Sequence, residues 1–79
     1  MFNEIFVKYI QNKGITPYRI AKETGISQGL MNAYMHNEKT PATENLIKIA
    51  NYLDVSIDYL LGRTDDPKVH RISNTRLQN

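Results

Sequence analysis

The stretch "GISQGLMNAYMHNEK", residues 25–39, has the spacing of a short helix whose two sides differ in chemistry. Met31, Tyr34 and Met35 fall on one side, as the 3.6-residue period of an α-helix requires. The other side carries amides, small side chains and one histidine, namely Gln28, Gly29, Asn32, Ala33 and His36. A helix face that meets water usually carries charged side chains, so this uncharged face indicates a surface made to contact another molecule.

Composition restricts the class of protein to which this helix belongs. With 79 residues the chain has room for one domain. It has no cysteine for disulfides or thiolate zinc sites, and its two histidines, His36 and His70, are far apart. No apolar run approaches the roughly 18 residues of a membrane span, and the charged start "MFNEIFVKYIQ" is unlike a signal peptide. We therefore expect a soluble, cytoplasmic, all-α protein with no metal, no cofactor and no membrane contact.

The net charge of +2 is small, but it is unevenly distributed. Residues 1–14 and 15–41 each carry a net charge of +1, residues 42–62 carry −2, and residues 63–79 carry +2. A polyanion would therefore bind away from residues 42–62. The charge alone does not identify a nucleic-acid ligand.

Local signals divide the first part of the chain into five helices. Thr16 and Pro17 suit the start of one helix, Ser27 suits the cap of the next, and glycines mark several helix ends. The expected helices lie near residues 2–13, 17–24, 28–36, 43–53 and 56–61. Only residues 25–27 separate the second helix from the third, and a short connection that contains glycine is typical of a helix-turn-helix. The sequence thus predicts a compact five-helix, helix-turn-helix domain over residues 1–63.

Two regions allow more than one interpretation. The fourth helix begins near Pro41, where Thr40, Ala42 and Thr43 all compete as its N-cap. Residues 64–79 lose the helical period and form a C-terminal tail. This tail is either frayed and partly disordered, or a short extended arm around residues 68–73 that pairs with a second subunit or lies along DNA.

The uncharged face of the 28–36 helix is suited to the edges of DNA bases. An α-helix fits the major groove, where a Gln or Asn amide matches the neighbouring N7 and N6 groups of adenine and contributes roughly 1–3 kcal/mol of discrimination. Small residues would let the helix backbone come close, and an alanine methyl would touch a thymine methyl. The candidate base-contacting residues are Gln28, Gly29, Asn32 and Ala33.

A second set of residues is suited to phosphate groups. The start of the 28–36 helix offers backbone N–H groups and a serine hydroxyl. Residues at the start of the preceding helix would reach the DNA backbone from one side, and residues in the loop after residue 36 would reach it from the other. The candidate phosphate-contacting residues are Tyr18, Arg19, Lys22, Ser27, Asn37, Lys39 and Thr40.

The candidate contact residues also have interpretations that involve no ligand. Glutamine follows a cap in many helices, so Gln28 could have no partner, and Asn32 could simply face solvent. Ala33 could be present only as a good helix former. Arg19 and Lys22 could form a solvated charged face.

The apolar side of the same helix is assigned to the core. Met31 and Tyr34 are expected to pack on the apolar face of the 17–24 helix. Met35 belongs either to the edge of the core or to a surface that binds a partner. His36 is expected at a solvated helix end, where the helix dipole favours a cation.

Most of the chain resembles a known family. The segments "IAKETGIS", "ENLIKIANYLDVSIDYLLG" and the "GRTD" that follows resemble the lambda-repressor-like (XRE) helix-turn-helix domain of Cro and the phage repressors, over roughly residues 2–66. The resemblance implies a DNA-binding domain with residues 28–36 as its recognition helix, acting as a homodimer on a palindromic operator with half-sites one helical turn apart. The family positions that face bases fall on Gln28, Gly29, Asn32 and Ala33, and the capping position near a phosphate falls on Ser27.

Several positions depart from the family's pattern. Pro17 stands where the family usually has a glutamine that contacts a phosphate, and Met35-His36-Asn37 replaces the frequent Glu-Asn-Gly. Ala42 occupies a position that is often a serine cap. Because basic residues are sparse near the recognition helix, binding would be weaker or would rely on Arg71 and Arg76 of the tail.

Two functions of different classes follow from these observations. The first is a sequence-specific double-stranded DNA-binding transcriptional regulator, a repressor of the Cro type. The second is a protein-interaction module, such as an antitoxin that binds a toxin or another regulator through Met35, the 52–59 region and the tail, with DNA binding secondary. An enzyme is not expected, because the chain has no nucleophile–base pair, metal cluster or phosphate-binding glycine loop.

Overall fold

The computed structural model describes residues 2–68, which form five helices and no strand. The helices are α1 (Phe2–Lys13), α2 (Pro17–Thr24), α3 (Gln28–Met35), α4 (Thr43–Leu53) and α5 (Ile57–Leu60). The expected all-α, five-helix fold is therefore confirmed. Helix α3 ends one residue earlier than expected, and α5 is one residue shorter at each end. Most of the tail, including Arg71 and Arg76 and the greater part of the expected arm, lies outside the described residues.

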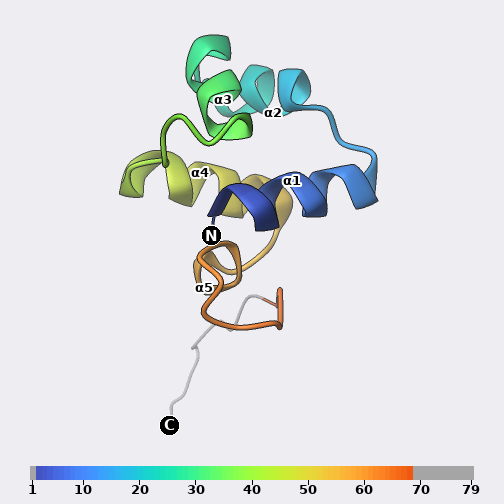
Figure 1. The fold of residues 1–79 in the computed structure, drawn as a ribbon. Helices are drawn as coiled ribbons and strands as arrows, with labels where there is room; N and C mark the ends of the chain where they lie inside the picture. Colours follow the sequence, from blue (N-terminus) through green and yellow to red (C-terminus); the bar gives the residue numbers. More distant parts are fainter. Residues whose placement is uncertain (1, 69–79) are drawn as a thin grey trace, which may run out of the picture.

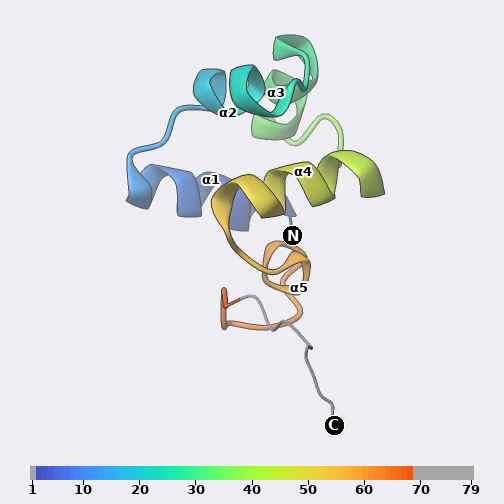
Figure 2. The same cartoon turned by 180° about the vertical axis from the view of Figure 1, so that it is seen from behind.

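The helices lie in three levels (Figures 1 and 2). In both views α2 and α3 lie at one end of the domain, α1 and α4 cross its middle, and α5 lies at the other end. The segment after α5 is attached to that other end, because the backbone N–H of Ser56 donates to the carbonyl of Pro67 at 3.0 Å. The helix-turn-helix is thus separated from α5 by the two central helices.

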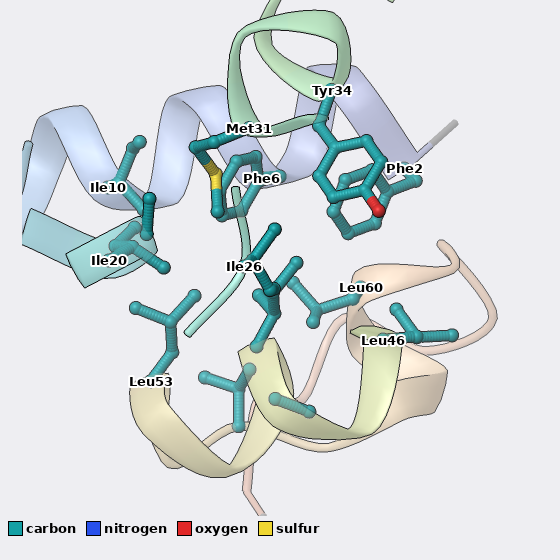
Figure 3. Close-up of a cluster of buried hydrophobic side chains, with 14 residues drawn as sticks. Phe2, Phe6, Ile10, Ile20, Ile26, Met31, Tyr34, Leu46, Leu53 and Leu60 are labelled. Carbon is teal, nitrogen blue, oxygen red and sulfur yellow. The ribbon is translucent and has the colours of Figure 1, made fainter. Parts of the chain in front are cut away.

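Every helix contributes to one hydrophobic core (Figure 3). The largest fully buried side chains are Phe6 and Ile10 from α1, Ile20 from α2, Met31 from α3, Ile49 from α4 and Leu60 from α5. The Phe2 and Phe6 rings stack with their centroids 5.0 Å apart. No helix of this length is stable alone in water, so burial in this shared core is what holds all five in place.

Side-chain caps begin three of the helices, as the sequence predicts. The hydroxyl oxygens of Thr16, Ser27 and Ser56 each accept a hydrogen bond from the backbone N–H three residues later, at 3.2, 3.1 and 3.0 Å. Helix α4 begins instead after Ala42, which makes no side-chain cap. Of the three candidate N-caps, Thr40, Ala42 and Thr43, the structure therefore has Ala42.

Tyr34 fixes α3 against two other helices. Its ring is 2% exposed and lies edge-on to Phe2, with the centroids 6.4 Å apart. Its phenol oxygen accepts a hydrogen bond from Nδ2 of Asn45 in α4 at 3.0 Å. The expected burial of Met31 and Tyr34 is therefore confirmed, but the ring contact and hydrogen bond of Tyr34 are with α1 and α4 rather than with α2.

Asn3 connects α1 to the last turn of α3. Its side-chain Nδ2 donates to the carbonyl of Tyr34 at 2.8 Å and to the carbonyl of Met35 at 2.7 Å. The last carbonyls of a helix lack partners within the helix, so these two bonds complete the C-terminal end of α3. Asn3 thereby fixes where that end lies relative to α1.

Replacing Asn3 with alanine is expected to destabilise the domain by about 1–3 kcal/mol. The Met35 carbonyl loses its side-chain donor, and the Tyr34 carbonyl is left with the longer 3.4 Å bond from the N–H of Asn37. Urea unfolding followed by circular dichroism measures this change. Asn12→Ala is the matched control, since Asn12 is an exposed asparagine on the same helix, and its effect should stay within about 0.5 kcal/mol. Equal losses in the two variants would contradict the role given to Asn3.

Two glycines of the helix-turn-helix differ in what the backbone demands of them. Gly25 ends α2 with a φ of 82°, which a residue with a side chain adopts only with strain. Gly29 lies inside the first turn of α3 in ordinary helical conformation. At either position an added Cβ would meet no atom within 4 Å, so only the backbone conformation decides the effect of a substitution.

The two alanine variants are expected to change stability in opposite directions. Gly25→Ala should destabilise the domain by about 1–2 kcal/mol, because alanine resists the left-handed conformation. Gly29→Ala should stabilise it by up to about 1 kcal/mol, because alanine has the higher helix propensity. The free energies of unfolding measured under one set of conditions test both values, and two changes of the same sign would refute this interpretation.

Candidate nucleic-acid interface

The turn between α2 and α3 is held by short-range bonds. The Thr24 hydroxyl donates to the carbonyl of Ile20 at 2.7 Å and accepts from the N–H of Ile26 at 3.3 Å. The Ile26 side chain is buried in the core, and the N–H of Gly25 donates to the carbonyl of Ala21 at 3.0 Å. The three-residue connection therefore holds α3 in one orientation against α2.

Three of the four candidate base-contacting residues lie on an exposed face of α3. Gln28, Gly29 and Asn32 are exposed, and Asn32 lies only about 40° around the helix from Gln28 at 3.6 residues per turn. The Nε2 of Gln28 also approaches the carbonyl of Tyr18 at 3.4 Å, which directs this amide toward the start of α2. We call Gln28, Gly29 and Asn32 the amide face.

The expectation that Ala33 shares this face is wrong. Ala33 is 9% exposed and is part of the buried set. It lies about 140° around the helix from Gln28, on the side toward the loop after α3. That loop folds back onto it, because the N–H groups of Glu38 and Lys39 donate to the Ala33 carbonyl at 2.8 and 3.3 Å.

The end of α3 is shaped by His36 and Asn37. The Nδ1 of His36 lies 2.9 Å from the carbonyl of Asn32, so a proton on Nδ1 is donated to that carbonyl, and the exposed ring covers the last turn. Asn37 adopts a φ of 59°. Asparagine tolerates this left-handed conformation better than most residues with a side chain.

The candidate phosphate-contacting residues are all exposed. Tyr18, at 63% exposure, Arg19 and Lys22 lie on α2, and Ser27 caps the start of α3. Asn37, Lys39 and Thr40 lie in the loop after α3. These residues therefore lie on both sides of the amide face along the chain.

Arg19 has an acidic neighbour that the sequence reasoning left out. Its Nε lies 3.5 Å from Oε2 of Glu23, one helical turn later, and both side chains are largely exposed. The i,i+4 spacing of the two residues was the available signal. Asn3, the other residue that was missed, has partners 31 and 32 residues away and gives no local signal.

The rest of the described chain offers no competing site for metal chemistry. Between residues 2 and 68 no group of three or more His, Cys, Asp or Glu side chains is placed to hold a metal ion. None of the helices in this range is long and apolar enough to cross a membrane.

Comparison with known proteins gives a consistent family. The sequence profile described as helix-turn-helix matches residues 8–60. Two uncharacterized HTH-type transcriptional regulators of Bacillus subtilis (strain 168) are similar to this chain. YqaE is 34% identical over 79 residues, which are all of this chain and 68% of YqaE. YobD is 39% identical over 59 residues, which are 72% of this chain and 53% of YobD. The cryptic phage CTXphi transcriptional repressor RstR of Vibrio cholerae is 46% identical over 55 residues, which are 67% of this chain and 49% of RstR.

These matches define the family but differ in length. The chain spans about half of YobD and RstR and about two thirds of YqaE. No solved structure matches the chain significantly. The profile match covers both helices of the turn as well as α4 and α5. The chain therefore belongs to the XRE-type helix-turn-helix family of transcriptional regulators, which are not enzymes.

Proposed function

We propose that this protein is a sequence-specific double-stranded DNA-binding transcriptional regulator, a repressor, whose recognition helix, residues 28–36, enters the major groove. The observation that carries this proposal is the amide face, which is exposed, carries no charge, and is held outward by the buried Met31 and Tyr34 on the other side of α3. Amide side chains on an outward helix match the donor and acceptor pattern of adenine. The family membership supports the same ligand.

Gly29 gives independent support for close contact with bases. Glycine inside a helix is less favourable than alanine by up to about 1 kcal/mol. An added Cβ would meet nothing within 4 Å, so packing within residues 2–68 does not require glycine here. A missing side chain beside the two outward amides lets the helix backbone approach the floor of the groove.

The exposed cations and hydroxyls around the amide face are proposed to contact phosphates. Tyr18, Arg19 and Lys22 of α2 would meet the DNA backbone on one side, together with Ser27 at the positive end of the α3 dipole. Asn37, Lys39 and Thr40 would meet it on the other side. Such contacts place the helix in the groove and release counterions, without carrying sequence information.

The repressor activity and the dimer are proposals taken from relatives and from the resemblance. RstR is described as a phage transcriptional repressor, and it is 46% identical to this chain over 55 residues. A single recognition helix covers only part of one turn of DNA, so a homodimer on a palindromic operator would double the contact area. We also propose that the protein acts in the cytoplasm, where the DNA is.

Gln28→Ala and Lys39→Ala are expected to weaken DNA binding in different ways. Without the Gln28 amide, discrimination should fall at one or two base pairs by about 1–3 kcal/mol, while binding to random DNA stays nearly unchanged. Lys39→Ala should weaken binding to all sequences and reduce the slope of log K against log salt by about 1. Selection of sites from a random pool, followed by fluorescence anisotropy at several salt concentrations, measures both effects.

Two results would count against this assignment. If Gln28→Ala weakens operator and random DNA equally, Gln28 does not contact bases in the proposed way. If no site is enriched and no duplex binds at low salt, the protein-interaction alternative takes the place of DNA recognition.

Glu23→Gln is expected to strengthen binding to DNA of any sequence. The variant frees Arg19 from its ion pair and removes a negative charge beside the proposed phosphate contacts. An exposed pair of this kind is worth up to about 1 kcal/mol, so the gain in affinity should be no more than about fivefold. Glu4→Gln makes the same charge change on α1, beside Tyr59 and Asp65, and should leave affinity unaltered. Equal gains would mean that only net charge matters.

A further inference from the structure

A shallow hollow lies beside the amide face, between α3 and the start of α2. Its lining comes from Pro17, Gln28, Met31, Asn32, Met35 and His36. Met31 is 1% exposed and belongs to the core beneath, whereas Pro17 and Met35 are partly exposed. The exposed polar side chains of Gln28, Asn32 and His36 complete the lining. The hollow thus combines apolar surface with amide and imidazole groups.

The apolar part of the hollow comes from Pro17 and Met35. The structure brings these two side chains to the same place although they are 18 positions apart. Met35 also packs against the core, which is one of the two alternatives left open for it, while its outer part remains available to a ligand.

We propose that this hollow receives the C5-methyl group of a thymine in the bound operator, an inference that rests on the proposed function. In the major groove thymine presents this methyl group beside its O4 acceptor. The Met35 thioether and the Pro17 ring supply apolar contacts for the methyl group. The Gln28 amide has two N–H donors, of which at most one is used by the Tyr18 carbonyl at 3.4 Å, so the other is available for O4.

The hollow favours thymine over the other bases for two physical reasons. Cytosine has a hydrogen at C5 and an N4 donor in place of O4, so it would leave the apolar surface unfilled and would face the Gln28 amide with a donor. Purines carry no methyl group at this edge. Filling the hollow with one methyl group is worth about fourfold in affinity, which corresponds to ~0.8 kcal/mol.

The test uses operators in which each thymine of the selected site is replaced in turn by uracil, which lacks only the methyl group. In each half-site, uracil at one thymine position should weaken binding of the wild-type chain about fourfold relative to the unmodified operator. For Met35→Ala the same replacement should change affinity less than twofold, while its response at every other thymine stays as in the wild type. Ile47→Ala, which removes an exposed apolar side chain outside the hollow, should keep the full wild-type pattern.

Folding is checked separately, by cooperative thermal unfolding of each variant. If Met35→Ala fails to fold, Pro17→Ala is tested in its place. This variant removes the other apolar side chain of the hollow, at the partly exposed start of α2. It should also bind the thymine and uracil operators equally well. If the wild type distinguishes no thymine from uracil, or both variants keep the full difference, the hollow is not a methyl site, although a selected operator would still support the proposed function. If no operator is selected, both proposals fail together.

Discussion

The burial of Met31 and Tyr34 determines what the rest of α3 can do. A helix of eight residues has no stable orientation of its own, so the core must supply one. Phe2 meets the ring of Tyr34, Asn45 donates to its hydroxyl, and Asn3 donates to the last carbonyls of the helix. Gln28 and Asn32 face outward because the opposite side of the same helix is fixed at three points.

The features predicted from sequence are those set by neighbouring residues. Thr16, Ser27 and Gly25 act on backbone groups three or four positions away, so their residue types are sufficient to locate α2, the turn and α3. Asn3 was missed because its partners come from a distant helix. Ala33 was misplaced although helical spacing sets it about 140° from Gln28. The loop after α3 returns to the Ala33 carbonyl on that side, a fold-back that the sequence does not reveal.

The charge around α3 bears on how the domain would discriminate between sequences. Residues 15–41 have a net charge of only +1, and Arg19 already has Glu23 as a neighbour. Phosphate contacts strengthen binding to all DNA alike, so a domain with few cations gains little affinity for random sequence. Occupancy of a site would then depend mainly on contacts to base edges, which is consistent with a recognition helix whose outward side chains are amides.

The hydrogen bond from Ser56 to the carbonyl of Pro67 has a consequence for the molecule's architecture. It holds the chain, just before Lys68, at the end of the domain where α5 lies. Both views place this end opposite the helix-turn-helix (Figures 1 and 2). A fluorophore or affinity handle joined at that point would therefore start on the far side of the domain from α3. Labelling or tethering there leaves the amide face unobstructed, which favours this position for single-molecule or surface-immobilised measurements.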